Sequence, residues 1–339
     1  MKASKSHATD VVIIGAGPVG IFAVFECGMM KLKTHVIDTL AEVGGQCIAL
    51  YPEKPIYDIP AHPNILAADL IENLKKQAEP FNPVYHLNQQ VTHVEKIDDG
   101  WKVTTSENTS ITCKAIIIAA GVGAFGPNRP PLPTIEEYEN KSVFYFVKNK
   151  ELFRGKNVVI AGGGDSAVDW ALNLYDVAKR ITVVHRRPKF RAALDSVDKL
   201  FALGQEGKID LAIPYQLDSL EGENGVLKKI GLKTLEGEEK IIEADALLAF
   251  FGLSMNLGPL AEWGLNLDKS HITVDIGTYQ TSIPGIFAIG DVATYTYKQK
   301  LILTGFAEAA GAAHQIRSIV YPGEVFHFQY STSQGVPGK

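Results

Sequence analysis

Residues 11–20 read VVIIGAGPVG, and this stretch decides the fold. Its first four residues are β-branched, which indicates a short strand buried on both faces, as in a parallel sheet. Gly15, Gly17 and Gly20 then give the spacing G-x-G-x-x-G, in which the glycines allow a tight turn, a close phosphate and a close helix. With a helix from about Val19 to Met30, the sequence predicts a dinucleotide-binding strand–turn–helix.

A carboxylate follows this turn at the distance that the motif requires. The stretch Thr34–Ile37 predicts a second strand, and Asp38 stands at its end, where an acid accepts hydrogen bonds from a ribose diol. In the next segment, Gly45 would let the backbone pass close to a bulky ligand, and Gln46 could hydrogen-bond to that ligand. Pro18 and the neighbouring glycines interrupt the apolar run that begins at residue 11, so this run is not a membrane span.

A second stretch, VVIAGGGDSAVDWALNLY at 158–175, repeats the outline of the first. An apolar strand runs into the variant spacing G-x-G-x-x-A, and a helix follows. The residues expected to hold a second pyrophosphate are Gly162, Gly163, Gly164, Asp165, Ser166 and Ala167. Asp165 and Ser166 also stand where a helix begins, so an ordinary capping role is the alternative for both.

The strand after this second turn ends in cations. Ile181–Val184 predicts the strand, and HRRPKFR follows it at the place where the first motif carries an acid. An acid would repel a ribose 2′-phosphate, whereas Arg186, Arg187 and Arg191 would hold it, which favours NADP(H) over NAD(H). The two motifs therefore predict two different dinucleotides, FAD at the first and NADPH at the second, with a hydride moving between them.

A third motif lies late in the chain. Residues 281–291 read TSIPGIFAIGD, which predicts a strand ending in Gly290 and Asp291 before a helix at 304–320. Asp291 could accept a hydrogen bond from the ribityl chain of FAD. The late motif would then close the FAD site.

This arrangement makes the FAD-binding domain discontinuous. We expect it to comprise residues 1–121 and 253–339, with an NADPH-binding domain at 122–252 inserted into it. The apolar strands at 115–119 and 246–251 are the expected crossing points. The Pro-rich stretch GPNRPPLP at 126–133 is the expected hinge or linker. The predicted fold class is α/β, with two Rossmann-like dinucleotide-binding domains.

Composition excludes several other functions. The 339 residues are 46% hydrophobic and 21% charged, which suits a globular protein with a sizeable core. A formal net charge of -5 gives no electrostatic case for nucleic acid or a membrane surface. Cys27, Cys47 and Cys113 form no CxxC pair and no metal-ligand spacing, so we expect a cytoplasmic protein that binds no metal.

The motifs G-x-G-x-x-G, GGQ, GGGDSA, HRR and T-x-x-P-G-x-F-A-x-G-D, in this order, resemble the thioredoxin-reductase-like flavoproteins over nearly the whole chain. Those enzymes carry a redox-active CxxC ahead of the second glycine motif. This chain has no cysteine after Cys113. The resemblance therefore implies a flavoprotein whose electrons leave the flavin directly, without a dithiol.

A closer resemblance is to the bacterial, thioredoxin-reductase-type ferredoxin–NADP⁺ reductases. It is carried by GGQCIALYPEKPIYDIP at 44–60, GGGDSAVDWAL at 162–172, HRRPKFRA at 185–192, LTGFAEAA at 303–310 and YSTS at 330–333. The stretch LYPEKPIYD and the terminal STS are the specific parts, because generic thioredoxin reductases lack them. The resemblance implies a homodimer that exchanges electrons with ferredoxin or flavodoxin.

The same resemblance assigns roles to single residues. It implies that Tyr51 stacks on the isoalloxazine ring and that Tyr330, from the C-terminal tail of this chain or of a partner subunit, covers the other face. It further implies FAD contacts at Asp38, Gln46, Val91, Phe125, Asp291 and Thr332. Three positions depart from the usual residues of the family, namely Asp38 for Glu, Cys47 for Leu and Tyr330 for His.

The implied activity needs no side-chain acid or base. A hydride would pass from NADPH to flavin N5, and single electrons would then pass to ferredoxin or flavodoxin, so no catalytic residue is predicted beyond the two stacking tyrosines. Two alternatives stay open at this point. One is a dithiol-free, NADPH-dependent flavin reductase acting on a quinone, oxygen or a small disulfide, and the other is a non-catalytic flavin redox sensor.

Overall fold

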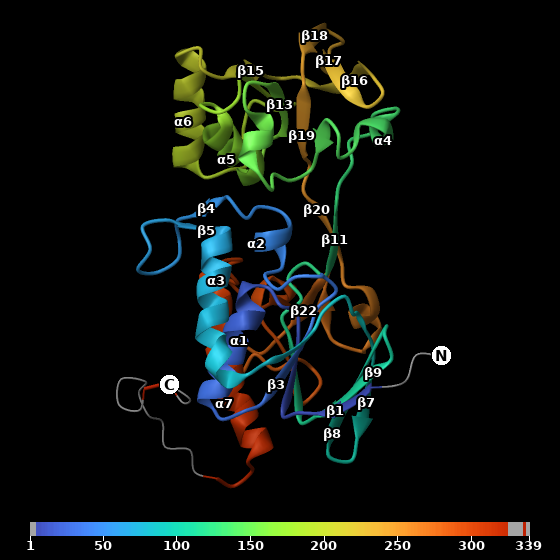
Figure 1. The fold of residues 1–339 in the computed structure, drawn as a ribbon, viewed down its shortest axis with the longest axis vertical. Helices are drawn as coiled ribbons and strands as arrows, with labels where there is room; N and C mark the ends of the chain where they lie inside the picture. The colour runs from blue at the N-terminus through green and yellow to red at the C-terminus, as the bar shows by residue number, and fades with distance from the viewer. Residues whose placement is uncertain (1–4, 325–334, 337–339) are drawn as a thin grey trace. The chain divides into compact units, whose positions relative to one another are not determined.

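The computed structural model describes residues 5–324 and 335–336. The chain divides into two compact units, the first formed by Met1–Phe125 with Met255–Lys339 and the second by Gly126–Ser254. Each unit is built on its own five-stranded sheet (Figure 1).

The sheet of the first unit is parallel, with strand order β23-β10-β2-β3-β6. Its strands are β2 (Val11–Ile14), β3 (Thr34–Ile37), β6 (Val84–His86), β10 (Ala115–Ile118) and β23 (Ile286–Ala288). Every residue of β2 and β10 is buried, as their unbroken apolar sequences predict. Alternate residues of β2 face two different cores, Val11 and Ile13 on one side and Val12 and Ile14 on the other.

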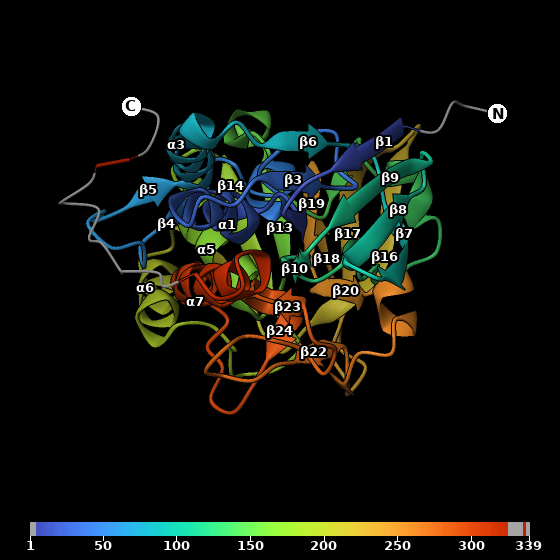
Figure 2. The same ribbon diagram turned by 90° about the horizontal axis from the view of Figure 1, so that it is seen from below.

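Helices cover one face of this sheet and a second sheet covers the other (Figure 2). The helices are α1 (Pro18–Met29), α3 (Ala67–Ala78) and α7 (Ile302–Val320), and α1 packs against both of the others. The covering sheet has the order β1-β9-β8-β7 and consists of β1 (Lys5–Ala8), β7 (Val91–Ile97), β8 (Gly100–Thr105) and β9 (Thr109–Cys113). The glycine turn after β2 is therefore held between two apolar cores.

Shorter elements complete the first unit. They are α2 (Gln46–Ala49), β4 (Pro55–Ile56), β5 (Ile65–Leu66), η1 (Glu79–Phe81), η3 (Gly258–Glu262), β21 (Leu267–Asp268), β22 (His271–Thr273), η4 (Gly290–Val292) and β24 (Ala293–Thr294). Among the helices of the described residues, none is both long enough and apolar enough to cross a membrane.

The sheet of the second unit is also parallel, with strand order β12-β19-β13-β14-β15. Its strands are β12 (Val143–Phe144), β13 (Asn157–Gly162), β14 (Arg180–Val184), β15 (Asp210–Ala212) and β19 (Ala246–Phe250). The remaining elements are α4 (Ile135–Tyr138), η2 (Lys150–Phe153), α5 (Asp165–Leu174), α6 (Leu194–Gln205), β16 (Gln216–Glu223), β17 (Val226–Lys233) and β18 (Glu239–Glu243). Strands β16, β17 and β18 form an antiparallel sheet that packs on the parallel one.

The two parallel sheets share one topology. Counted from the strand before the glycine turn, the first unit has the order β6-β3-β2-β10 and the second the order β15-β14-β13-β19, which is the Rossmann order 3-2-1-4 in both. In such sheets ligands bind at the carboxyl ends of the strands, where the direction of winding reverses, which is beside β2 and beside β13. The predicted α/β class with two Rossmann-like domains is confirmed.

Two short strands carry the chain between the units. The crossing strands are β11 (Ala124–Pro127) and β20 (Leu253–Asn256), which pair with each other. The strands at 115–119 and 246–251, expected to be the crossing points, are instead the inner strands β10 and β19 of the two sheets. The prediction was wrong because a short apolar run has the same pattern at the end of a domain and in its centre.

The expected linker at 126–133 coincides with the crossing only at its start, because β11 ends at Pro127. Leu132 lies in the core of the second unit, with 7% of its surface exposed. Arg129 forms an ion pair with Glu139, with 2.8 Å between guanidinium nitrogen and carboxylate oxygen. These contacts hold residues 128–133 on the second unit, so the prolines stiffen a packed segment.

Candidate functional site

At Gly15 and Gly20 the first glycine turn leaves no room for a side chain. Gly15 has a φ of +111°, and a Cβ there would lie 2.3 Å from the carbonyl oxygen of Ala119. On α1, a Cβ at Gly20 would lie 1.9 Å from the carbonyl oxygen of Gly15, so its absence lets the helix approach the turn. Gly45 has a φ of +57°, and a Cβ there would lie 2.8 Å from the Cα of Gly17. Two backbone segments thus meet with no side chain between them.

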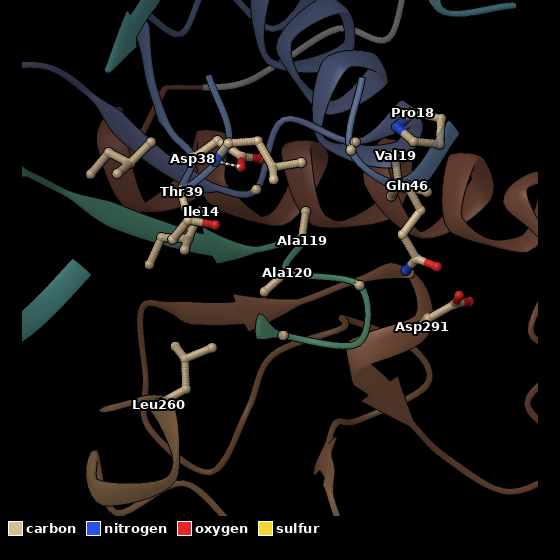
Figure 3. Close-up of a pocket in the computed structure, with 18 of the residues that line it drawn as sticks. Ile14, Pro18, Val19, Asp38, Thr39, Gln46, Ala119, Ala120, Leu260 and Asp291 are labelled. Carbon is tan, nitrogen blue, oxygen red and sulfur yellow. Dashed lines mark hydrogen bonds between the residues drawn. The ribbon is translucent and has the colours of Figure 1, made fainter. Parts of the chain in front are cut away.

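A pocket opens at this meeting point (Figure 3). Many of the predicted FAD residues line it, namely Gly15, Gly17, Pro18, Asp38, Gly45, Gln46, Tyr51, Val91, Gly290 and Asp291. Gly20 lies behind the wall, where it sets the distance between helix and turn. The side chain of Phe125 and the residues Tyr330 and Thr332 lie outside the described part of the chain.

Asp38 is held rigidly at one end of this pocket. Its carboxylate accepts hydrogen bonds from the backbone N–H of Ala16, at 2.6 Å, and of Leu40, at 2.8 Å. Burial raises the pKa of Asp38, and these backbone donors oppose that shift by stabilising the charged form. Figure 3 shows the hydrogen bond to this carboxylate and places Asp291 at the far end of the lining. The turn therefore fixes the acid before any ligand binds.

The other end of the pocket is formed by Gln46, at the start of α2, and by Gly290 and Asp291 in η4. Gly290 has a φ of +73°, which favours glycine, and its N–H donates to Oε2 of Glu308 on α7 at 2.7 Å. Figure 3 shows the side chains of Gln46 and Asp291 in the same region of the pocket. This end offers an amide and a carboxylate to a ligand.

The two ends suit different parts of one elongated ligand. An acid fixed beside a glycine turn matches a ribose diol, and the close approach of Gly17 and Gly45 leaves space for a pyrophosphate beside the backbone. The lining is otherwise largely apolar, which suits flat aromatic rings. The donors, acceptors and open backbone of this pocket fit FAD.

Tyr51 and Cys47 lie next to each other in the wall. The Sγ of Cys47 and the hydroxyl of Tyr51 are 3.9 Å apart, and burial raises the pKa of this thiol to about 11. Burial also raises the thiol pKa of Cys113, to about 12, and that of Cys27. All three thiols are free, buried and protonated at neutral pH, and so lack the thiolate that redox chemistry needs.

Sequence reasoning missed much of the wall. The further lining residues are Ile14, Val19, Ile37, Thr39, Leu40, Cys47, Gln89, Gln90, Ala119, Ala120, Gly121, Gly123, Leu257, Pro259, Leu260, Leu301 and Ile302. Those that follow β10 could have been found, since every strand of a parallel sheet ends at the same edge. The residues of η3 carry no motif, and only the folded chain brings them to the pocket.

In the second unit, the basic segment folds back on the second glycine turn. The N–H of Arg191 donates to the carbonyl oxygen of Gly163 at 2.6 Å. The ring of His185 occupies the place of a missing side chain, because a Cβ at Gly163 would lie 2.1 Å from that ring. Burial, together with the charges of Arg187 and Arg186, lowers the pKa of His185. The His185 ring thus packs against the second glycine turn, beside the basic segment.

The three predicted arginines, Arg186, Arg187 and Arg191, are exposed. Within the described part of the chain none of them forms an ion pair, whereas Arg154 and Arg180 of the same unit each pair with an acid. The capping alternative fails for Asp165, whose carboxylate accepts from the N–H of Ala193 at 2.9 Å and does not cap α5. A glycine turn with unpaired cations beside it fits a phosphorylated dinucleotide.

Two Rossmann-like units with a glycine turn at each switch point define a protein that binds two dinucleotides. The chain belongs to the pyridine nucleotide-disulphide oxidoreductase family, whose profile matches residues 9–315.

Individual members of this family that resemble the chain include ferredoxin–NADP reductases. The chain is 58% identical to the ferredoxin–NADP reductase of Paramagnetospirillum magneticum over 98% of each chain. It is 56% identical to the ferredoxin–NADP reductase of Rhodospirillum rubrum over 100% of this chain and 99% of the other. Among solved structures, thioredoxin reductase of Lactococcus lactis has a TM-score of 0.79 and 28% identity, covering 92% of this chain and 99% of its own. The resemblance stated from the sequence is confirmed.

Proposed function

We propose that this chain is an FAD-dependent ferredoxin–NADP reductase, which transfers electrons between NADPH and ferredoxin. The observation that carries this proposal is the asymmetry of the two glycine turns. One stands beside a carboxylate that the turn itself orients, and the other beside exposed, unpaired arginines. The near-full-length likeness to ferredoxin–NADP reductases supports the same assignment.

FAD would bind in the pocket of the first unit. Asp38 would accept from the ribose, the backbone between Gly17 and Gly45 would receive the pyrophosphate, and Asp291 would meet the ribityl chain. We further propose that Tyr51 stacks on the isoalloxazine ring, with Val91 in contact with the cofactor. Phe125, Thr332 and Tyr330, the last from the tail of this chain or of a partner subunit, stay in the proposal on the resemblance alone.

NADPH would bind to the second unit. Gly162, Gly163, Gly164, Asp165, Ser166 and Ala167 would receive its pyrophosphate, and Arg186, Arg187 and Arg191 its 2′-phosphate. The hydrogen bond from Arg191 to Gly163 supports this proposal, because it ties the basic segment to the turn. The proposed domains are therefore an FAD-binding first unit and an NADPH-binding second unit, with boundaries near those at 121/122 and 252/253.

When bound, FAD supplies the chemistry, since it takes a hydride from NADPH and gives up electrons one at a time. The residues of this chain would bind FAD and NADPH, orient the two cofactors and exclude water from them. The three cysteines take no part, because each is buried and protonated. The geometry therefore supports direct transfer to the acceptor and favours neither of the two alternative activities.

We also propose that the enzyme is a cytoplasmic homodimer and that flavodoxin can replace ferredoxin as its partner. These finer points rest on the resemblance in sequence. Size measurement of the purified protein in solution tests the first, and reduction of flavodoxin in place of ferredoxin tests the second.

The decisive experiment is rapid mixing of the purified protein with NADPH. We expect a yellow protein that releases FAD on denaturation, whose visible absorbance bleaches on mixing and recovers when oxidised ferredoxin is added. A quinone and a small disulfide serve as control acceptors. A colourless protein that FAD does not reconstitute, or faster turnover with the control acceptors than with ferredoxin, would reject the proposal.

A further inference from the structure

A buried ion pair lies directly behind one end of the FAD pocket. It joins Glu308 of α7 to Lys298, and the two side chains are 1% and 4% exposed. A buried charge is costly unless it is paired and fully hydrogen-bonded, so this pair is an unusual feature of the core. None of the residues predicted to contact FAD belongs to it.

The Glu308 carboxylate collects donors from a single stretch of chain. The N–H of Gly290 donates to Oε2 at 2.7 Å, the hydroxyl of Tyr295 donates to Oε1 at 2.7 Å, and Lys298 reaches the same oxygen. The ammonium of Lys298 also lies 5.3 Å from the centre of the Tyr295 ring. One carboxylate thus fastens residues 290–298 to α7 at three points.

The helix that carries Glu308 is itself fixed to the first glycine turn. Gly305, three residues before Glu308 on α7, faces Val19 of α1, and a Cβ at Gly305 would lie 2.4 Å from Cγ2 of Val19. Val19 lines the pocket. The position of Glu308 relative to the pocket is therefore set by the close packing of the Gly305 backbone against the Val19 side chain.

We propose that Glu308, balanced by Lys298, is a positioning residue that holds the Gly290–Asp291 turn so that the carboxylate of Asp291 faces the FAD pocket. This inference rests on the proposed function. Gly290 directly precedes Asp291 in the chain. The hydrogen bond from the Gly290 N–H to Glu308 therefore orients the turn from which Asp291 projects. The positive charge of Lys298 balances the Glu308 carboxylate. Without it, Glu308 would place a second, uncompensated negative charge near Asp291 and a bound pyrophosphate.

The test uses full-length holoprotein and two readouts other than turnover. The rate of FAD release is followed by the rise in free-flavin fluorescence, and the placement of the bound flavin by its circular dichroism in the visible range. The variants are Glu308→Ala, Glu308→Gln, Lys298→Met and the double variant Glu308→Gln/Lys298→Met. Ile316→Ala is the control, because Ile316 is a fully buried residue of the same helix with an apolar environment.

We expect Glu308→Ala and Lys298→Met to release FAD at least about tenfold faster and to change the visible circular dichroism. The double variant should release FAD more slowly than Lys298→Met, because it contains no unpaired buried charge. Ile316→Ala should lower the melting temperature and leave FAD release within about twofold of the parent. If Glu308→Ala does not fold, Lys298→Met and the double variant decide the question.

One result would overturn the inference. It is that the Glu308 and Lys298 variants lose thermal stability as Ile316→Ala does, while their FAD release and visible circular dichroism match those of the parent. A parent protein that binds no FAD would reject the proposed function, and this inference with it. A parent that binds FAD, with variants unchanged in both readouts, would reject this inference alone.

Discussion

Replacing Arg186 and Arg187 together with glutamine should change the choice of coenzyme and leave the fold intact. Both side chains are exposed, and within the described residues neither forms an ion pair, so the folded protein loses no internal ion pair. A well-formed hydrogen bond between a charged donor and a phosphate contributes about 1.5–3 kcal/mol. Exposure to solvent weakens both bonds, so we expect a total loss of about 1.5–3 kcal/mol in NADPH binding. This loss corresponds to about tenfold to about a hundredfold in affinity.

The assay is rapid mixing at several coenzyme concentrations, which gives separate dissociation constants for NADPH and NADH. The matched control is Arg154→Gln/Arg180→Gln, which removes the same charge from the same unit. Arg180 begins β14, whereas Arg186 follows its far end, and the surface ion pairs lost in the control are worth little. NADPH should weaken in the test variant alone, and NADH should change little in either. Equal weakening of both coenzymes, or an equal effect of the control, would show that the arginines do not read the 2′-phosphate.

Three further predictions follow from other parts of the structure. A variant with Cys27, Cys47 and Cys113 all replaced by alanine should keep flavin reduction and acceptor turnover, apart from a loss of thermal stability, and a Cys47→Ala variant that is reduced normally but cannot pass electrons on would contradict the direct route. Gly45→Ala should abolish FAD retention while circular dichroism stays that of a folded protein, because its Cβ would lie 2.8 Å from Gly17; a fully yellow variant would contradict it. Burial and the neighbouring His35 lower the pKa of His86 to about 4, so His86 binds a proton less readily in the folded protein than in the unfolded chain. The melting temperature should therefore fall as the pH falls from about 6.5 towards about 4. His86→Asn should make this fall in melting temperature smaller.

The glycine turns could be predicted because their requirements are local. The close contacts at Gly15 and Gly20 occur between residues a few positions apart or at the end of the adjacent strand, and G-x-G-x-x-G encodes them directly. The place of Asp38 follows from the same unit, since a strand of fixed length separates it from the turn. The spacing of residues in the sequence therefore predicts short-range geometry of this kind.

Other parts of the site could not be predicted from spacing. Leu257 and Leu260 reach the pocket through η3, whose sequence carries no motif. Glu308 lies on the buried, small-residue face of α7, and no motif in the sequence indicates that residues 290–298 supply its three donors. The crossing strands β11 and β20 were missed because their pairing joins residues more than a hundred positions apart.

The paired crossing strands also set an order for synthesis. The second unit is one continuous stretch, Gly126–Ser254, so all of its residues leave the ribosome together. The first unit cannot complete its fold until later, because β23, the edge strand beside β10, begins only at Ile286, and α7 ends at Val320. Domains fold as units during synthesis once their chain is complete. The unit that starts later in the chain is therefore complete first, and the half-made sheet of the other, with β10 unpaired on one side, stays exposed until the last part of the chain emerges.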